Sequence, residues 1–471
     1  MQGAELADYA VKVAEEHGAS YCEARFERTA ANTFLLKNGT PELSGFEQRS
    51  GIGIRLLIGG SLGFVSTNQF SREKIRRMIS RIAHSLSMRS ALHEKVALSN
   101  EKPFRGKDVV KQRIDMRDLS AEEKLAFLTE AEKALLASGV NCTGRFLTLS
   151  DSISEEHLVT SEGTSIRSSI PRVEFNYYLT VSANGKSMQR YWMYGNSGGY
   201  EFVKRWDVPS LMQREARTLH TMLTKGKKFP KGITSLVAGP QVTGIMVHES
   251  GGHPYEADRI FGREAAQAGE SFISPERVGE RIGSEAVTIV DDPTLKNSFG
   301  YYRFDNEGVR ARRKVLLEKG RIHEFLHNRQ TAALMGLRSN GSSRSVDFDK
   351  ESIVRMSNTF MLPGKYSEEE LIEGIREGVL MRNFMEWNID DQRMNQRYVG
   401  AECYRIHRGE VAEPLLSPTL EITTPALYSS IDACGKNLEM HAGSCGKGEP
   451  MQGISVWLGG PSIRLRKVRV T

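Results

Sequence analysis

Segments that alternate apolar and polar residues between turn residues recur along the chain and restrict it to sheet-based folds. Between Val140 and about Tyr200 they read FLTLS, HLVTS, TSIRSS and VEFNYYLTVSA, separated by Gly, Ser and Asp. Further strand-like segments lie at 23–39 and 51–68, and most of 286–471 reads as short strands. Helical patterns stand apart from these segments, at about 3–17, 71–87, 121–139 and 203–224. Runs of strands with segregated helices predict an α+β fold rather than a doubly wound parallel sheet.

One stretch of the chain has the composition of a linker. KGKKFPKG at 225–232 is basic, contains Gly and Pro, and has no periodicity. We therefore predict an N-terminal domain at 1–225 and a C-terminal domain at 233–471. In the second domain, TSLVAG indicates a strand and VTGIMVHES a helix, and a further helix is expected at 367–380.

The composition excludes several classes of protein. The 471 residues are 39% hydrophobic and 26% charged, which is typical of globular domains, and no apolar run reaches the roughly 18–20 residues of a membrane span. The net charge of +6 is spread along the chain, whereas nucleic-acid binding needs basic charge concentrated on one face. The start of the chain does not resemble a signal peptide, and the five cysteines form no CxxC pair. We expect a cytoplasmic protein that binds neither membranes nor nucleic acids.

The stretch VHESGGHPYEADRI places His248 and His253 five positions apart, with Glu249 after the first histidine. In the common HExxH helix the two ligands are four positions apart, about 40° around the axis. A spacing of five corresponds to about 140° and would prevent shared ligation on a regular helix. Gly251 and Gly252 lower the cost of a π-like turn, or of a helix end, that brings His253 beneath His248. The glycine pair therefore favours a metal site.

Glu249 is adjacent to the first histidine and could accept a proton from a metal-bound water, as the glutamate of HExxH peptidases does. By spacing alone, the same residues could be hydrogen-bonded core or surface residues without a metal. A catalytic zinc site also needs a third protein ligand. The candidates are Glu256, Asp258, Cys403, Cys434, His441 and Cys445.

Cys445 is distinguished from the other candidates by its setting. Glycines on both sides permit close approach of the backbone, and a thiolate is a strong zinc donor. Read as a lone cysteine, it would be a small buried apolar residue. Asp258, close to the motif, is the first choice for a residue that orients the ligand histidines from outside the metal site.

Several longer blocks, in a fixed order, give the chain a family resemblance. The sequence resembles the TldD/PmbA family of metallopeptidases, whose members were formerly described as modulators of DNA gyrase. The blocks span most of 240–470, and the N-terminal half matches more loosely. They are GIMVHESGGHPYEAD at 244–258, YYRFDNEGVRARRKVLLEKGRI at 301–322, LHNRQTAALMG at 326–336, RMSNTFMLPG at 355–364, GSCGKGEPMQG at 443–453 and WLGGPSIRL at 457–465.

The resemblance implies that His248, His253 and Cys445 ligate zinc and that Glu249 activates the water. It also implies that the N-terminal domain is α/β with a mixed or antiparallel sheet, and that the C-terminal domain is mostly antiparallel β and carries the metal-site helix. Related subunits that lack the HExxxH motif are non-catalytic partners. This chain has all four positions, which places it with the catalytic members.

We therefore expect a zinc-dependent peptidase that hydrolyses short or unfolded polypeptides, as a homodimer or as a heterodimer with a related non-catalytic subunit. The alternative is a non-catalytic binding or assembly subunit with a structural metal that modulates another enzyme. The number of ligands separates the two, because a structural zinc is closed by four protein ligands, whereas a catalytic zinc keeps one position open.

Overall fold

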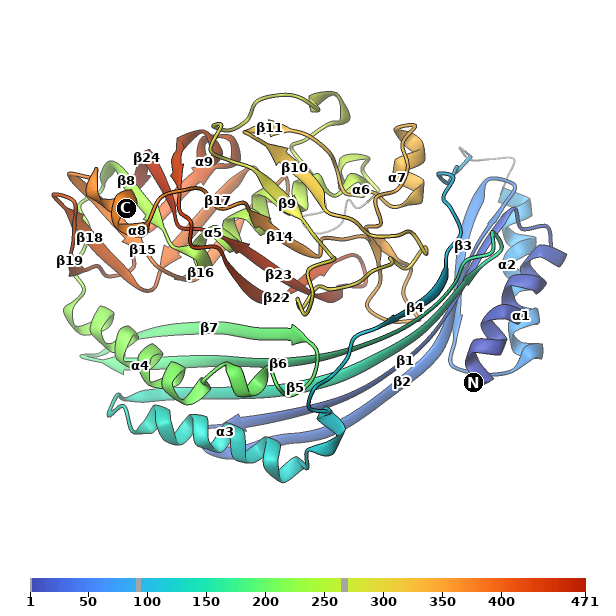
Figure 1. Ribbon diagram of the computed structural model, residues 1–471, viewed down its shortest axis with the longest axis horizontal. Helices are drawn as coiled ribbons and strands as arrows, with labels where there is room; N and C mark the ends of the chain where they lie inside the picture. The colour runs from blue at the N-terminus through green and yellow to red at the C-terminus, as the bar shows by residue number, and fades with distance from the viewer. Residues whose placement is uncertain (1, 90–94, 264–269) are drawn as a thin grey trace.

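The computed structural model describes residues 2–89, 95–263 and 270–471, which form two sheet-based halves (Figure 1). A long curved sheet forms the N-terminal half, and the C-terminal half lies within its curve. The elements of the N-terminal half are α1 (Gln2–Glu16), β1 (Tyr21–Lys37), β2 (Thr40–Ile58), β3 (Ser61–Thr67), α2 (Arg72–Arg89), β4 (Arg105–Val109), α3 (Ala121–Leu136), β5 (Cys142–Thr160), β6 (Ser165–Ala183), β7 (Lys186–Ser197) and α4 (Val208–Lys225).

The curved sheet has the order β3-β2-β1-β5-β6-β4, with β7 paired to β6 outside this path. Antiparallel pairing joins β1, β2, β3, β5, β6 and β7, whereas β4 runs parallel to β6. Its two faces differ because side chains alternate along each strand. In β1, Cys22, Ala24 and Phe34 lie on the apolar face, while Glu23 and Arg25 lie on the opposite face.

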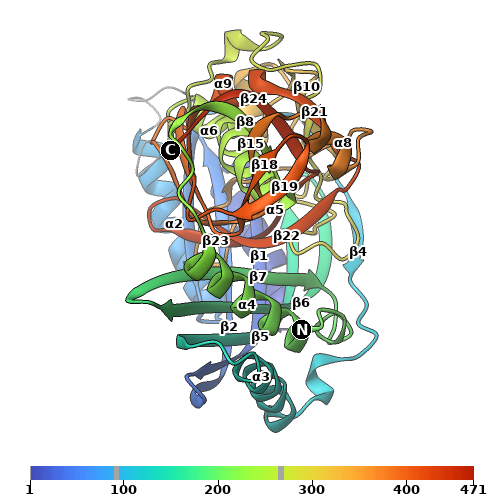
Figure 2. The same cartoon turned by 90° about the vertical axis from the view of Figure 1, so that its left-hand side faces the viewer.

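Helices cover the apolar face at both ends of the curved sheet. The helices α1 and α2 pack on β1, β2 and β3, and α3 and α4 pack on β1, β5, β6 and β7. In Figure 2, α3 lies below the sheet and the C-terminal half lies above it. The charged face therefore meets the C-terminal half, where Arg55 forms ion pairs with Glu23 and with Glu307.

The C-terminal half consists of shorter elements. They are β8 (Gly232–Ala238), α5 (Pro240–Val247), α6 (Ala257–Ile260), β9 (Ile289–Asp291), β10 (Lys314–Glu318), β11 (Arg321–Ile322), α7 (Arg329–Leu334), β12 (Ser343–Arg344), β13 (Ile353–Val354), β14 (Asn358–Met361), α8 (Glu368–Glu373), β15 (Glu377–Met381), β16 (Phe384–Ile389), β17 (Asn395–Gly400), β18 (Cys403–His407), β19 (Glu410–Pro414), β20 (Thr419–Thr423), α9 (Thr424–Ser430), β21 (Ile431–Cys434), β22 (Glu439–Lys447), β23 (Gln452–Gly460) and β24 (Ile463–Val470).

Two larger sheets hold α5 between them. One has the order β16-β17-β20-β24-β8-β15-β18-β19, with β21 also paired to β24, and the other has the order β11-β10-β9-β14-β23-β22. Their pairing is antiparallel except for β8 with β15 and β14 with β23. The helix α5 contacts β8 of the first sheet and β14, β22 and β23 of the second. The strand β22 is at the edge of its sheet and runs beside β7 of the N-terminal half.

The α+β fold, the antiparallel character of the C-terminal half and the mixed N-terminal sheet agree with the sequence analysis. The stretch 225–232 connects α4 to β8, and the division into two domains there stays a prediction. Among the described residues, no helix has both the length and the apolar content that a membrane span requires.

The prediction of a helix at 367–380 is wrong beyond Glu373. The helix α8 ends there, and Gly374 caps it. The following residues form β15, in which Val379, Leu380 and Met381 are buried between β8 and β18. Over so short a span the apolar residues fit both the helical and the strand periodicity. Pairing with β8 and β18 favours the strand.

Replacing Ile54 by alanine is expected to destabilise the protein. Ile54 is fully buried on β2, in the apolar cluster under α1 and α2. Truncation of a buried isoleucine leaves a cavity and costs about 2–5 kcal/mol in the free energy of unfolding. Urea denaturation followed by circular dichroism measures the loss. Ile233, which is 76% exposed, is the control, and its alanine variant should change stability by less than about 0.5 kcal/mol. Equal effects of the two substitutions would contradict the assignment of Ile54 to the core.

Candidate metal centre

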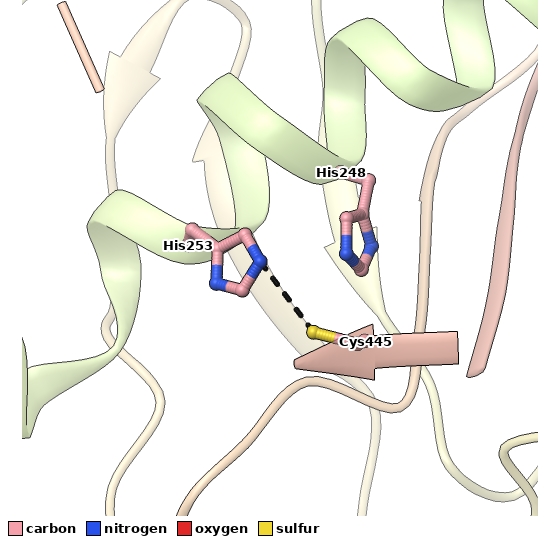
Figure 3. A group of neighbouring side chains, drawn as sticks. All are labelled: His248, His253 and Cys445. Carbon is pink, nitrogen blue, oxygen red and sulfur yellow. Dashed lines mark hydrogen bonds between the residues drawn. The ribbon is translucent and has the colours of Figure 1, made fainter. Parts of the chain in front are cut away.

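The helix α5 continues into a π-helical turn at His248–Gly252, in which the amide of His253 donates a hydrogen bond to the carbonyl of His248. A bond between residues five apart widens the turn, so that residues with this spacing come to lie on one side of the helix. The two imidazole rings are 4.9 Å apart between centroids. Figure 3 shows both rings on the side that faces β22. The π-like turn predicted from the glycine pair is therefore confirmed.

Close packing around the turn leaves no room for a side chain at either glycine unless neighbouring side chains move. A Cβ atom at Gly251 would lie 2.7 Å from the Cδ1 of Ile289 and 2.7 Å from the hydroxyl of Tyr428. A Cβ atom at Gly252 would lie 1.9 Å from the sulfur of Met356. The backbone of the turn therefore rests directly on β9 and on the segment before β14.

The strand β22 brings a third donor to the two histidines. Suitable atoms of His248, His253 and Cys445 all lie within 4.8 Å of one another, and the Cys445 sulfur is 3.4 Å from Nε2 of His253. The three side chains point toward one another in Figure 3. All three residues are buried, and Nδ1 of His248 is a buried atom without a hydrogen-bond partner among the described residues. Two imidazoles and a thiolate are a donor set that suits zinc, so the residues fit this metal.

Electrostatics favour the ionised form of Cys445. Burial raises the pKa of its thiol, but electrostatic interactions with His253, Arg355 and His248 outweigh burial and hold the pKa well below its usual value. A guanidinium nitrogen of Arg355 also donates a hydrogen bond to the backbone carbonyl of Cys445, which anchors this part of β22. The thiolate is the form that binds a metal.

Glu256 is the carboxylate that orients a histidine of the centre. One oxygen of Glu256 lies 2.9 Å from Nδ1 of His253, accepts a hydrogen bond from Arg259 at 2.7 Å, and is 3.4 Å from the ammonium of Lys447. Burial alone would raise the pKa of Glu256. The interactions with Lys447, His253 and Arg259 lower it by more, so the net pKa is well below its usual value. A carboxylate in this position fixes the ring so that Nε2 faces the other donors.

The carboxylate of Asp258, which we expected to orient a ligand histidine, contacts Lys447 and the backbone of Val354 instead. Its carboxylate accepts a hydrogen bond from Lys447 at 2.6 Å and another from the amide of Val354 at 3.2 Å. Lys447 in turn reaches Glu256. The carboxylate in contact with a histidine of the candidate centre is therefore that of Glu256, and Lys447 links Asp258 to it.

Glu249 is held by two side chains from the hairpin of β16 and β17. One carboxylate oxygen accepts a hydrogen bond from the indole of Trp387 at 3.2 Å, and the other accepts one from Arg393 at 2.6 Å. The side chain of Glu249 is 10% exposed. Each carboxylate oxygen has two lone pairs, so Glu249 can still accept a proton or a further hydrogen bond.

Three other candidates for the third ligand, Cys403, Cys434 and His441, do not belong to the cluster of His248, His253 and Cys445. The Cys434 thiol contacts the carbonyl of Ala286, Cys403 is buried in the core, and the ring of His441 stacks at its edge on Trp192. Burial and the charge of Arg190 lower the pKa of His441 to about 3, so this ring is neutral.

A cavity of about 280 Å³ opens beside the three donors. It is lined by Tyr191, Trp192, Met193, Ile245, His248, Glu249, His253, Phe384, Met385, Trp387, Arg393, Ala442, Gly443, Ser444, Cys445, Gly446, Val456 and Leu458. The lining thus combines β7 of the N-terminal half with α5, β16, β22 and β23 of the C-terminal half.

Sequence reasoning missed Trp387, Arg393 and Lys447. Lys447 carries a local signal, because it is two residues after Cys445 and therefore on the same face of β22. Trp387 and Arg393 are in contact with Glu249 only through the tertiary fold, and no local pattern marks them.

Family models match the chain in three successive regions. Residues 231–471 match the C-terminal domain of the PmbA/TldA metallopeptidases, residues 22–86 match their domain 1, and residues 114–222 match their central domain.

Individual proteins are similar over nearly the whole length. A metalloprotease from Methanothermobacter thermautotrophicus is 33% identical over 97% of this chain and 96% of its own. A zinc metalloprotease TldD homolog from Saccharolobus solfataricus is 26% identical over 98% of both chains. The crystal structure of TldE from Thermococcus kodakarensis superposes with a TM-score of 0.76 and 17% identity, over 98% of this chain and 99% of its own, which supports the same fold.

Substitution of Gly252 by alanine is expected to disturb the π-helical turn, because the added Cβ would overlap the sulfur of Met356. Overpacking of this kind costs about 1–3 kcal/mol, and we expect a lower thermal unfolding midpoint together with a lower metal content. Calorimetry and elemental analysis measure the two effects. At Gly232 the same substitution meets no described atom within 4 Å and is the matched control. A Gly252→Ala protein with unchanged midpoint and metal content would refute the role of close packing at this turn.

Replacement of Glu256 by glutamine is expected to weaken metal binding by about 10–100-fold, because the amide is a poorer partner for the imidazole of His253 than the carboxylate is. Competition with a chromogenic chelator measures the affinity. Glu280→Gln, at an exposed glutamate paired with Arg277, is the control. Equal affinities in the two variants would show that Glu256 does not support the centre.

Proposed function

Because the chain belongs to the TldD/PmbA metallopeptidase family, we propose that it is a catalytic zinc peptidase that hydrolyses short or unfolded polypeptides. The observation that carries the proposal is the convergence of His248, His253 and Cys445 in one buried cluster beside the carboxylate of Glu249. These three residues would hold the metal.

The number of donors favours catalysis over a purely structural metal. Among the described residues, the cluster that could hold an ion contains three protein donors and opens onto a cavity. A structural zinc is usually enclosed by four protein ligands, whereas a catalytic one keeps a position for water or substrate. The rival function, a non-catalytic assembly subunit with a structural metal, is therefore the weaker proposal.

The metal and the side chains of the protein would contribute different steps of the hydrolysis. When bound, zinc would lower the pKa of a coordinated water to about 7 and polarise the carbonyl of the substrate. Glu249 accepts the proton of the attacking water and delivers it to the nitrogen of the leaving amine, as a general base and then a general acid. Arg393 and Trp387 keep the carboxylate in place, since each donates to a different oxygen.

The substrate is proposed to bind in an extended conformation. The strand β22 carries Cys445 and, at the edge of its sheet, pairs with β23. A peptide could add a strand beside such an edge, with main-chain hydrogen bonds providing affinity for many sequences. The cavity of about 280 Å³ accommodates a segment of chain but not a folded domain. A peptide complex of the Glu249→Gln protein without backbone hydrogen bonds to β22 would exclude this binding mode.

We further propose a cytoplasmic protein that acts as a homodimer or with a related non-catalytic subunit. The five cysteines are free and buried, which is compatible with a reducing compartment. Sedimentation at several concentrations measures the oligomeric state, and a monomer with full peptidase activity would refute the requirement for a second subunit.

The substitution Glu249→Gln is expected to retain zinc and to lower kcat by about 10²–10⁴-fold, because the amide cannot accept the proton. Cys445→Ala is expected to lose zinc. Elemental analysis and hydrolysis of an unstructured peptide measure both, with Glu285→Gln, at an 80% exposed side chain, as the control. Undiminished hydrolysis by the Glu249→Gln protein would exclude Glu249 as the general base.

A further inference from the structure

We propose that the chain selects peptides with a large apolar side chain next to the bond that is cleaved, and that β7 of the N-terminal half forms the selecting wall. The inference rests on the proposed peptidase function and specifies its substrate class.

The wall comes from two parts of the chain that are distant in sequence. In the lining of the cavity, β7 contributes Tyr191, Trp192 and Met193. Next to them, β16 contributes Phe384 and Trp387. Because the same cavity contains the three donors, a side chain that enters it belongs to a residue close to the reacting carbonyl.

The aromatic residues of the wall are held in fixed positions. Trp192 packs edge to face on Phe384 with 5.8 Å between ring centroids, and Phe384 packs in the same way on Trp387 at 5.6 Å. The guanidinium of Arg190 lies 4.8 Å from the ring centroid of Trp192 and donates a hydrogen bond of 2.5 Å to the carbonyl of Phe384. Arg190 is also paired with Glu215 of α4 at 3.3 Å. The wall is thus preorganised before a substrate binds.

The charges of the cavity disfavour a charged substrate side chain. Outside the three donors, Glu249 and Arg393 are the charged residues in the lining, and they are paired with each other at 2.6 Å. A lysine or aspartate side chain that entered would lose its hydration beside apolar and aromatic groups, which is unfavourable without a partner. A phenylalanine or leucine side chain would instead bury its surface against the wall.

The size of the cavity limits selection to a single side chain. At about 280 Å³ it is slightly smaller than the roughly 300–1,000 Å³ that ligand pockets occupy. The cavity must also accommodate the bond to be cleaved. We therefore expect strong selection at one of the two positions that flank this bond.

The test uses unstructured peptides that differ only at one flanking residue, which is Phe, Leu, Ala, Asp or Lys. Mass spectrometry locates the cleaved bond, and kcat/KM is measured for each peptide with the zinc-loaded protein. At one flanking position, kcat/KM for Phe or Leu is expected to exceed that for Asp or Lys by about 10–200-fold. Values within about twofold at both positions would overturn the inference while leaving the peptidase proposal intact. Cleavage of no peptide by a zinc-loaded protein would overturn both.

Two variants locate the selecting wall. Tyr191→Ala truncates a 45% exposed ring, and Trp192→Leu keeps an apolar residue at the buried position. Tyr178→Ala is the matched control, because Tyr178 pairs with Tyr191 across β6 and β7 but does not line the cavity. The ratio of kcat/KM for the Phe peptide to that for the Ala peptide should fall at least fivefold in either wall variant, chiefly through KM, and stay at the wild-type value in the control. An unchanged ratio in both wall variants would overturn the proposal that β7 forms the selecting wall.

Discussion

The hydrogen bond from the amide of His253 to the carbonyl of His248 is the interaction on which the centre depends. A regular helix would place these two rings about 140° apart, and no metal could bind both. The wider π turn aligns them, and the glycines let side chains of Ile289, Tyr428 and Met356 pack closely against its backbone. The packing of the C-terminal sheets thus sets the geometry of the two imidazoles.

Buried charges join the π turn to the strand that carries the thiol. Lys447 of β22 reaches both Glu256 and Asp258, which follow the motif histidines in the chain. Buried ions are stable only when they are paired and hydrogen-bonded, so removal of any one of these groups leaves an uncompensated charge. This network holds β22 against the segment after the turn, and it is this contact that sets Cys445 opposite His253.

Local signals in the sequence account for much of the fold and for the core of the centre. The alternation in β1 and the glycine pair of the turn each act over a few residues, and each predicts the observed element. The helix predicted at 367–380 failed because strand pairing with β8 and β18 outweighs local periodicity. The contacts of Trp387 and Arg393 with Glu249 depend on which surfaces meet in three dimensions, and periodicity carries no information about such contacts.

The separation of the donors along the chain has a consequence for biosynthesis. Cys445 follows His253 by 192 residues. A growing chain therefore contains both histidines long before the thiol, which lies on β22, a strand that is paired with β23 in the folded chain. Bringing Cys445 to His253 closes a loop of this length, which costs entropy. The packing of the C-terminal half offsets that cost. The cluster of His248, His253 and Cys445 is therefore complete only after residue 445 has been made and the C-terminal half has folded.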